Sequence, residues 1–146
     1  MAVITKDVLV VGMKRDDVLA WLGQADNHAR ILEGAFASCD ASGSGAWTLG
    51  LACQDKQRTF TYRFDRVDDA HGGRRVLCTT EGKRVKGKLH YSLRTMKPST
   101  NTMITLHADY EAGGALGRVL DGMTVRPALE VAWQRAMDNL EQALLG

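Results

Sequence analysis

The sequence contains few cysteines and prolines and no long apolar run. It has three cysteines and two prolines in 146 residues. Cys39, Cys53 and Cys78 lie far apart, form no C-x-x-C pair and lack the spacing of metal ligands, so we expect reduced thiols in a cytoplasmic protein. No stretch of about 18 consecutive apolar residues occurs, so we expect no membrane-spanning helix.

Signatures of several chemistries are also missing. The chain has neither G-x-S-x-G nor H-E-x-x-H, and the glycines around Ser44 do not form a phosphate-binding loop. The first residues, MAVITKDVLVVG, alternate and carry charges, unlike a signal peptide. We therefore expect no nucleophilic triad, no metal and no cofactor.

The bulk composition is that of one ordinary globular domain spanning residues 1–146. Hydrophobic residues make up 45% of the chain and charged residues 25%, and the net charge is +2. This charge alone argues neither for nor against a polyanionic partner. No repeat, low-complexity tract or linker divides the chain.

Alternation of apolar and polar residues predicts a sheet through the middle of the chain. The first strand is expected over 2–11, and two short helices over 14–22 and 25–32, ended by Gly23 and Gly34. Six further strands are predicted over 35–40, 46–53, 58–67, 74–81, 85–96 and 101–110. Their short turns favour consecutive antiparallel hairpins with one solvated face.

The same alternation predicts which side chains share a face. The apolar face should carry Phe60, Tyr62, Leu89, Tyr91, Leu106 and Tyr110. The solvent face should carry Lys86, Lys88, His90 and Arg94.

One long helix is predicted at the end of the chain, over 115–145, with a length of about 45 Å if unbroken. Pro127 should bend or restart it near Met123–Thr124. Two neighbouring apolar stripes run along it: Leu116, Leu120, Met123, Pro127, Val131 and Gln134, and Leu129, Trp133, Ala136, Leu140 and Leu144. It is the only long helix available to cover the apolar sheet face, and a gap between the two would be a cavity. We expect residues 116–123 to pack more weakly than the second half, because Gly117 and Gly122 lower helix propensity there.

Three stretches resemble a known superfamily. They are residues 8–21 (VLVVGMKRDDVLAW), 26–34 (DNHARILEG) and 109–121 (DYEAGGALGRVLD). With the order of elements, they resemble the START-like or SRPBCC superfamily, which includes lipid-transfer START domains, polyketide cyclases and dehydrases, coenzyme-Q-binding proteins and allergens of the birch-pollen type. The resemblance implies an α+β helix-grip fold: a curved antiparallel sheet of about seven strands, two short helices after the first strand, and a long C-terminal helix. The family commonly has tryptophan or phenylalanine with proline before the glycine of the second helix, where this chain has ARILE at 29–33, so no subfamily is indicated.

The resemblance further implies a small hydrophobic ligand, such as a lipid, polyketide, isoprenoid or quinone-like molecule, between sheet and helix. Pocket-wall candidates are the inward aromatic and apolar residues, because a buried phenol needs a partner that a ligand can supply. They are Trp47, Phe60, Tyr62, Leu89, Tyr91, Leu106, Tyr110, Leu120 and Met123. Two other interpretations stay open: a cyclase- or dehydratase-like enzyme with a tyrosine or histidine as acid or base, and a ligandless interaction domain. No catalytic residue is identified.

The histidines and the one basic cluster are expected on the surface. His28 and His71 fall in a short helix and a glycine turn, and His90 and His107 fall on the polar sides of their strands. We expect the basic stretch 83–88 to form a charged hairpin on the outer face of the sheet. We expect no nucleic-acid partner, because the aromatics alternate onto the opposite face. Transient contact with a membrane surface and the oligomeric state stay open.

Overall fold

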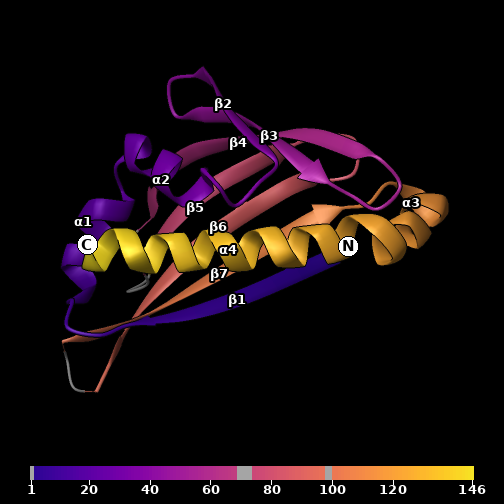
Figure 1. Ribbon diagram of the computed structural model, residues 1–146. Helices are drawn as coiled ribbons and strands as arrows, with labels where there is room; N and C mark the ends of the chain where they lie inside the picture. Colours follow the sequence, from indigo (N-terminus) through magenta and orange to yellow (C-terminus); the bar gives the residue numbers. More distant parts are fainter. Residues whose placement is uncertain (1, 69–73, 98–99) are drawn as a thin grey trace.

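Seven antiparallel strands form one sheet, and a long C-terminal helix lies across one of its faces in the computed structural model (Figure 1). The structure describes residues 2–68, 74–97 and 100–146. The strand order is β1-β7-β6-β5-β4-β3-β2, so the first strand pairs with the last and every other pair is consecutive in sequence. The strands are β1 (Ala2–Val10), β2 (Ser38–Gly43), β3 (Ala46–Ala52), β4 (Gln57–Asp68), β5 (Arg74–Glu81), β6 (Lys86–Met96) and β7 (Asn101–Glu111).

The helices flank this sheet in the predicted order. They are α1 (Arg15–Leu22), the short 3-10 turn η1 (Ala25–Asn27), α2 (His28–Leu32), α3 (Gly114–Leu120), the π-helical turn η3 (Asp121–Val125) and α4 (Arg126–Leu145). The first three cover one end of the sheet, and α3 lies at the opposite end (Figure 1). No helix among the described residues is long and apolar enough to cross a bilayer.

The predicted orientation of the strands is confirmed. The six side chains placed on the helix side, Phe60, Tyr62, Leu89, Tyr91, Leu106 and Tyr110, are at most 3% exposed. Lys86, Lys88 and Arg94 are exposed, and His90 is half-buried on the outer face. There the His90 ring stacks on that of His107 across the β6–β7 pair, with ring centroids 5.1 Å apart. Period-two alternation was therefore sufficient to orient these strands.

Strand β2 begins three residues later than predicted. Ala35 and Phe36 are buried in the loop after α2, where they belong to the hydrophobic core, and pairing with β3 begins only at Ser38 opposite Gly50. The predicted strand included Ala35 and Phe36 because both residues are apolar.

Polar contacts fasten α4 to β1 and to α2. Lys6, which interrupts the apolar face of β1, pairs with Glu130 at 2.6 Å, and Arg126 donates to the Val3 carbonyl at 2.7 Å. Asn139 donates to the backbone carbonyls of Ile31 and Glu33, both at 3.0 Å. The helix is therefore held along one edge of the sheet and at the α2 end.

The long terminal helix is interrupted at the π-helical turn η3. Pro127 has no N–H to donate to the carbonyl one turn earlier, and its ring crowds that turn. The helix accommodates the proline with a wider turn immediately before it and restarts as α4, with proline among its first residues. This turn includes Met123 and Thr124, where the helix was predicted to bend.

Candidate functional site

Seven of the nine predicted pocket-wall residues come together on the sheet under α4. Trp47, Phe60, Tyr62, Leu89, Tyr91, Leu106 and Tyr110 are all at most 7% exposed. Leu120 is half-buried, whereas the Met123 side chain is 67% exposed. Met123 therefore does not face the sheet. That the other eight residues contact a ligand stays a prediction.

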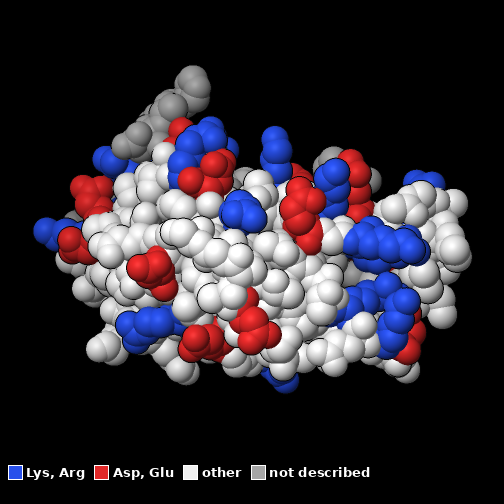
Figure 2. Space-filling view, turned by 90° about the horizontal axis from the view of Figure 1, so that it is seen from above, with Lys and Arg blue, Asp and Glu red and all other residues white. Residues whose placement is uncertain are grey.

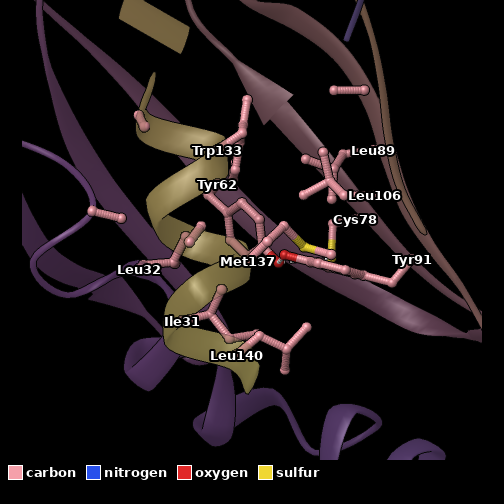
Figure 3. Close-up of a cluster of buried hydrophobic side chains, with 14 of the residues drawn as sticks. Ile31, Leu32, Tyr62, Cys78, Leu89, Tyr91, Leu106, Trp133, Met137 and Leu140 are labelled. Atoms are coloured by element: carbon pink, nitrogen blue, oxygen red, sulfur yellow. Dashed lines mark hydrogen bonds between the residues drawn. The ribbon is translucent and has the colours of Figure 1, made fainter. Parts of the chain in front are cut away.

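Aromatic rings fill the space between the centre of the sheet and α4. Trp133 of α4 lies with its ring centroid 5.1 Å from Phe36, 6.2 Å from Tyr62 and 6.5 Å from Phe60. Figure 3 shows Trp133, Met137 and Leu140 reaching from α4 toward Tyr62 and Tyr91. This part of the interior is packed by the protein's own side chains.

His28 is buried, and the expectation that it is exposed was wrong. Its side chain is fully inaccessible, with Nε2 2.7 Å from the Leu22 carbonyl oxygen and Nδ1 2.6 Å from the Tyr62 hydroxyl. A carbonyl only accepts, so Nε2 carries the proton, and Nδ1 accepts from Tyr62. The Leu22 carbonyl thus selects the tautomer of a neutral imidazole.

The Tyr62 hydroxyl is the centre of a buried hydrogen-bonded cluster. Because its proton goes to His28, its oxygen accepts from the Tyr91 hydroxyl at 3.0 Å and from the Cys78 thiol at 3.2 Å. The Tyr62 and Tyr91 oxygens lie close to the Cys78 sulfur in Figure 3. We call His28, Tyr62, Cys78 and Tyr91 the buried polar cluster.

Burial keeps the buried polar cluster neutral near pH 7. It lowers the pKa of His28 to about 4, against a weaker opposing effect of the Leu22 carbonyl, and raises the pKa of Cys78 to about 12. Burial likewise raises the pKa values of Tyr62 and Tyr91. A general base works best with a pKa near the operating pH, and both nitrogens of His28 are already occupied. The cluster is therefore suited to holding α2 on the sheet rather than to proton transfer.

One sequence signal pointed to the burial of His28. Ile31 and Leu32, three and four residues later, share its helix face and are also fully buried. Because α2 has only five residues, this apolar pattern is short. The polarity of histidine therefore favoured the prediction of an exposed side chain. Sequence reasoning also missed Asp121, a buried carboxylate that accepts a hydrogen bond from Tyr110 at 2.6 Å.

The other histidines lie as predicted or outside the described residues. His90 and His107 are on the outer face, where His107 lies 3.4 Å from Asp109. Partial burial, with smaller effects of His107 and Arg75, lowers the pKa of His90. His71 lies outside the described residues.

An apolar groove runs between β3 and the first half of α4. Its volume is about 360 Å³. Its walls are Phe36 and Leu51 on one side and Ala128, Val131 and Ala132 of α4 on the other, with Arg135 also lining it. Short side chains keep the groove open, and Phe36 separates it from Trp133. We call this the β3–α4 groove.

Other, larger hollows have charged side chains in their walls. One, of about 510 Å³, lies at the start of α3 among Glu111, Arg118 and Asp121. A second, of about 450 Å³, lies along β5, β6 and β7 among Lys86, Lys88 and other charged residues, and a third, of about 410 Å³, lies between α2 and α4 among Arg30, Glu33 and Asn139. The walls of the β3–α4 groove, by contrast, carry one charged side chain, that of Arg135.

Comparison with known proteins identifies the fold. No family model matches the chain, and no curated protein matches it by sequence. The solved structure of TTHA0849 from Thermus thermophilus is similar over 99% of this chain and 97% of its own, with a TM-score of 0.65 at 12% identity. The chain has the helix-grip fold.

Two further solved structures are similar to this chain over nearly its whole length. XoxI from Bacillus cereus covers 99% of this chain and 96% of its own, with a TM-score of 0.60 at 14% identity. Ara h 8.0201, a structure of the birch-pollen-allergen type, covers 99% of both chains, with a TM-score of 0.54 at 13% identity. The predicted fold class is confirmed, and at these identities the helix-grip architecture is what the chain shares with them.

Proposed function

We propose that this chain is a START-like protein that binds a small hydrophobic molecule between its sheet and C-terminal helix, and that the ligand enters through the β3–α4 groove. The observation that carries the proposal is the apolar lining of this groove beside the core aromatics Phe36 and Trp133. Pockets for drug-sized ligands typically measure about 300–1,000 Å³ and are mostly apolar. The groove falls at the lower end of this range.

The attachment of α4 supports an entrance at this position. Its ion pair and hydrogen bonds run to β1 and α2, through Lys6, Arg126 and Asn139. Among the described residues, no hydrogen bond or ion pair joins α4 to β3. The helix can therefore move away from β3 without losing a polar contact, and only apolar contacts resist the movement.

The lining also favours an amphipathic ligand. Apolar walls would receive a lipid, polyketide, isoprenoid or quinone-like body, and Arg135 would pair with a carboxylate or sulfonate at its end. A ligand larger than the groove would displace the Phe36 ring and reach Trp133, Phe60 and Tyr62 behind it. In this proposal the predicted wall residues on the sheet form the inner end of the site.

A cyclase-like activity is not proposed for this chain. The titratable groups that converge in the interior are the buried polar cluster, which is neutral near pH 7 and internally hydrogen-bonded, and the Tyr110–Asp121 pair, whose members bond to each other. Binding therefore accounts for the geometry better than catalysis. The three free cysteines fit a reducing compartment, which supports the cytoplasm as its location.

Titration with an anilinonaphthalene sulfonate dye tests this function. Ala128→Phe places a large ring in the groove from a half-buried position and should weaken dye binding at least tenfold. Ala20→Phe adds the same ring at an exposed site on α1 and should leave binding unchanged. Equal dye affinities of the two variants, with both melting like the wild type, would place the ligand outside the groove and overturn the proposal.

A further inference from the structure

The outward face of α3 and η3 is apolar. Leu116, Val119 and Met123 are 69%, 57% and 67% exposed. Their spacing of three and four residues places them on one side of the helix, whereas Gly117, Asp121 and Val125 are buried. A surface helix normally presents polar residues to water. We call Leu116, Val119 and Met123 the α3 apolar face.

Cationic side chains surround this end of the molecule. Arg84 fixes the β5–β6 turn beside the start of α3 by donating to the carbonyl of Ala112 at 3.1 Å. This contact brings Lys83 to the same end, where its backbone carbonyl lies close to Gly113 at the start of α3. Figure 2 shows more blue than red at the end where α3 lies, around an uncharged white tip. The nearby cations are Lys83, Arg84, Lys86, Arg118 and Arg126, and the nearby carboxylates are Glu81, Glu111, Asp121 and Glu130, the last of which pairs with Arg126.

The nearby carboxylates neutralise these cations less than their number implies. Asp121 is buried and hydrogen-bonded to Tyr110. Among the ion pairs of the described residues, none involves Lys83, Lys86 or Arg118. Lys86 lies opposite Glu111 in the β6–β7 register, so Lys83 and Arg118 carry the charges most available to an anionic partner beside the apolar face.

We propose that the α3 apolar face and its cations form a docking surface for anionic lipid bilayers. Apolar side chains flanked by lysine and arginine are the arrangement by which interfacial helices enter the headgroup region, while the cations contact anionic lipid. The mixed chemistry favours a bilayer over a second copy of the chain, because two copies meeting face to face would bring these cations together. This docking goes beyond the proposed ligand binding and does not depend on it.

Co-sedimentation with vesicles of phosphatidylcholine and phosphatidylserine, at a ratio of 7:3, tests the proposal. The wild-type chain should bind these vesicles at low salt and lose most binding at about 0.5 M salt, where exposed charges are screened. It should bind pure phosphatidylcholine much more weakly. Lys83→Gln and Arg118→Gln should each weaken binding about fivefold, the effect typical of one cation near an anionic membrane.

A matched pair of double variants separates the α3 apolar face from general hydrophobicity. Leu116→Ser with Met123→Ser should reduce vesicle binding at least tenfold, because the face then has little apolar surface to insert. Val11→Ser with Leu145→Ser changes residues that are 62% and 57% exposed elsewhere and should leave binding unchanged. All of these positions are exposed, so the variants should fold.

Three results would overturn the docking surface. They are a wild-type chain that stays in the supernatant, equal loss of binding in the two double variants, and a concentration-dependent dimer abolished by Leu116→Ser with Met123→Ser. Dye binding without vesicles distinguishes this failure from that of the proposed function. The Leu116→Ser with Met123→Ser variant should retain full dye affinity, because neither residue lines the β3–α4 groove.

Discussion

Acid should destabilise this protein through His28. Burial lowers the pKa of His28 to about 4 in the folded state, against 6.5 for an unperturbed histidine. Between these values the unfolded chain binds a proton that the folded chain excludes, so protonation favours unfolding. The contribution of His28 is complete above about pH 6.5 and is lost as the pH falls toward 4. At about 1.4 kcal/mol per pKa unit, the loss amounts to about 3 kcal/mol.

Urea unfolding followed by circular dichroism at pH 7, 6, 5 and 4.5 would measure this loss. The free energy of unfolding should fall by about 1 kcal/mol per pH unit through the window from this residue. His28→Gln should be less stable at pH 7, because it disturbs the bonds to Leu22 and Tyr62, but its stability should depend less on pH. His90→Gln is the matched control, since the half-buried His90 lies on the outer face and should contribute less.

Proton NMR of the histidine rings provides a second check. The His28 resonance should titrate with a midpoint near 4, whereas an exposed histidine titrates near 6.5. A midpoint near 6.5, or identical pH dependence of unfolding in the wild type and His28→Gln, would refute the reasoning.

Three further predictions concern packing, a buried hydrogen bond and the thiols. Leu140→Ala should cost about 2–5 kcal/mol of unfolding free energy, because Leu140 is fully buried. Met123→Ala, at a 67% exposed position, should cost less than about 0.5 kcal/mol. Equal urea midpoints of the two variants would contradict this prediction. Tyr110→Phe should cost about 1–3 kcal/mol by leaving the buried Asp121 carboxylate without its donor, an expectation that an unchanged melting temperature would disprove. Chelator and reductant should leave the melting temperature unchanged, since the three cysteines are free thiols and no metal-binding group of side chains occurs among the described residues. A clear decrease in melting temperature under either treatment would contradict this prediction.

Strand orientation was predictable from sequence because it depends on local alternation. On β6, Leu89 and Tyr91 alternate with Lys88 and His90, and burial follows that pattern. A half-solvated strand in a sheet has one apolar side, so the sequence and the packing carry the same period. The position of the irregular helical turn was likewise local, because Pro127 alone sets it.

The site was less predictable because it depends on contacts between distant segments. His28 is buried because Tyr62, 34 residues away, and the Leu22 carbonyl satisfy both ring nitrogens. No spacing in the sequence encodes that pairing. The sequence likewise shows two neighbouring apolar stripes along the terminal helix, and the structure buries the one that contains Leu129, Trp133, Ala136 and Leu140.

The central claim, a hydrophobic ligand in the β3–α4 groove, is tested most directly by alanine-methyl NMR during titration with the anilinonaphthalene sulfonate dye. The account predicts saturable shifts for the methyl groups of Ala35, Ala128 and Ala132, which line the groove, and none for Ala20 on α1. Unshifted methyl groups at all three groove positions, with shifts elsewhere or nowhere, would contradict it.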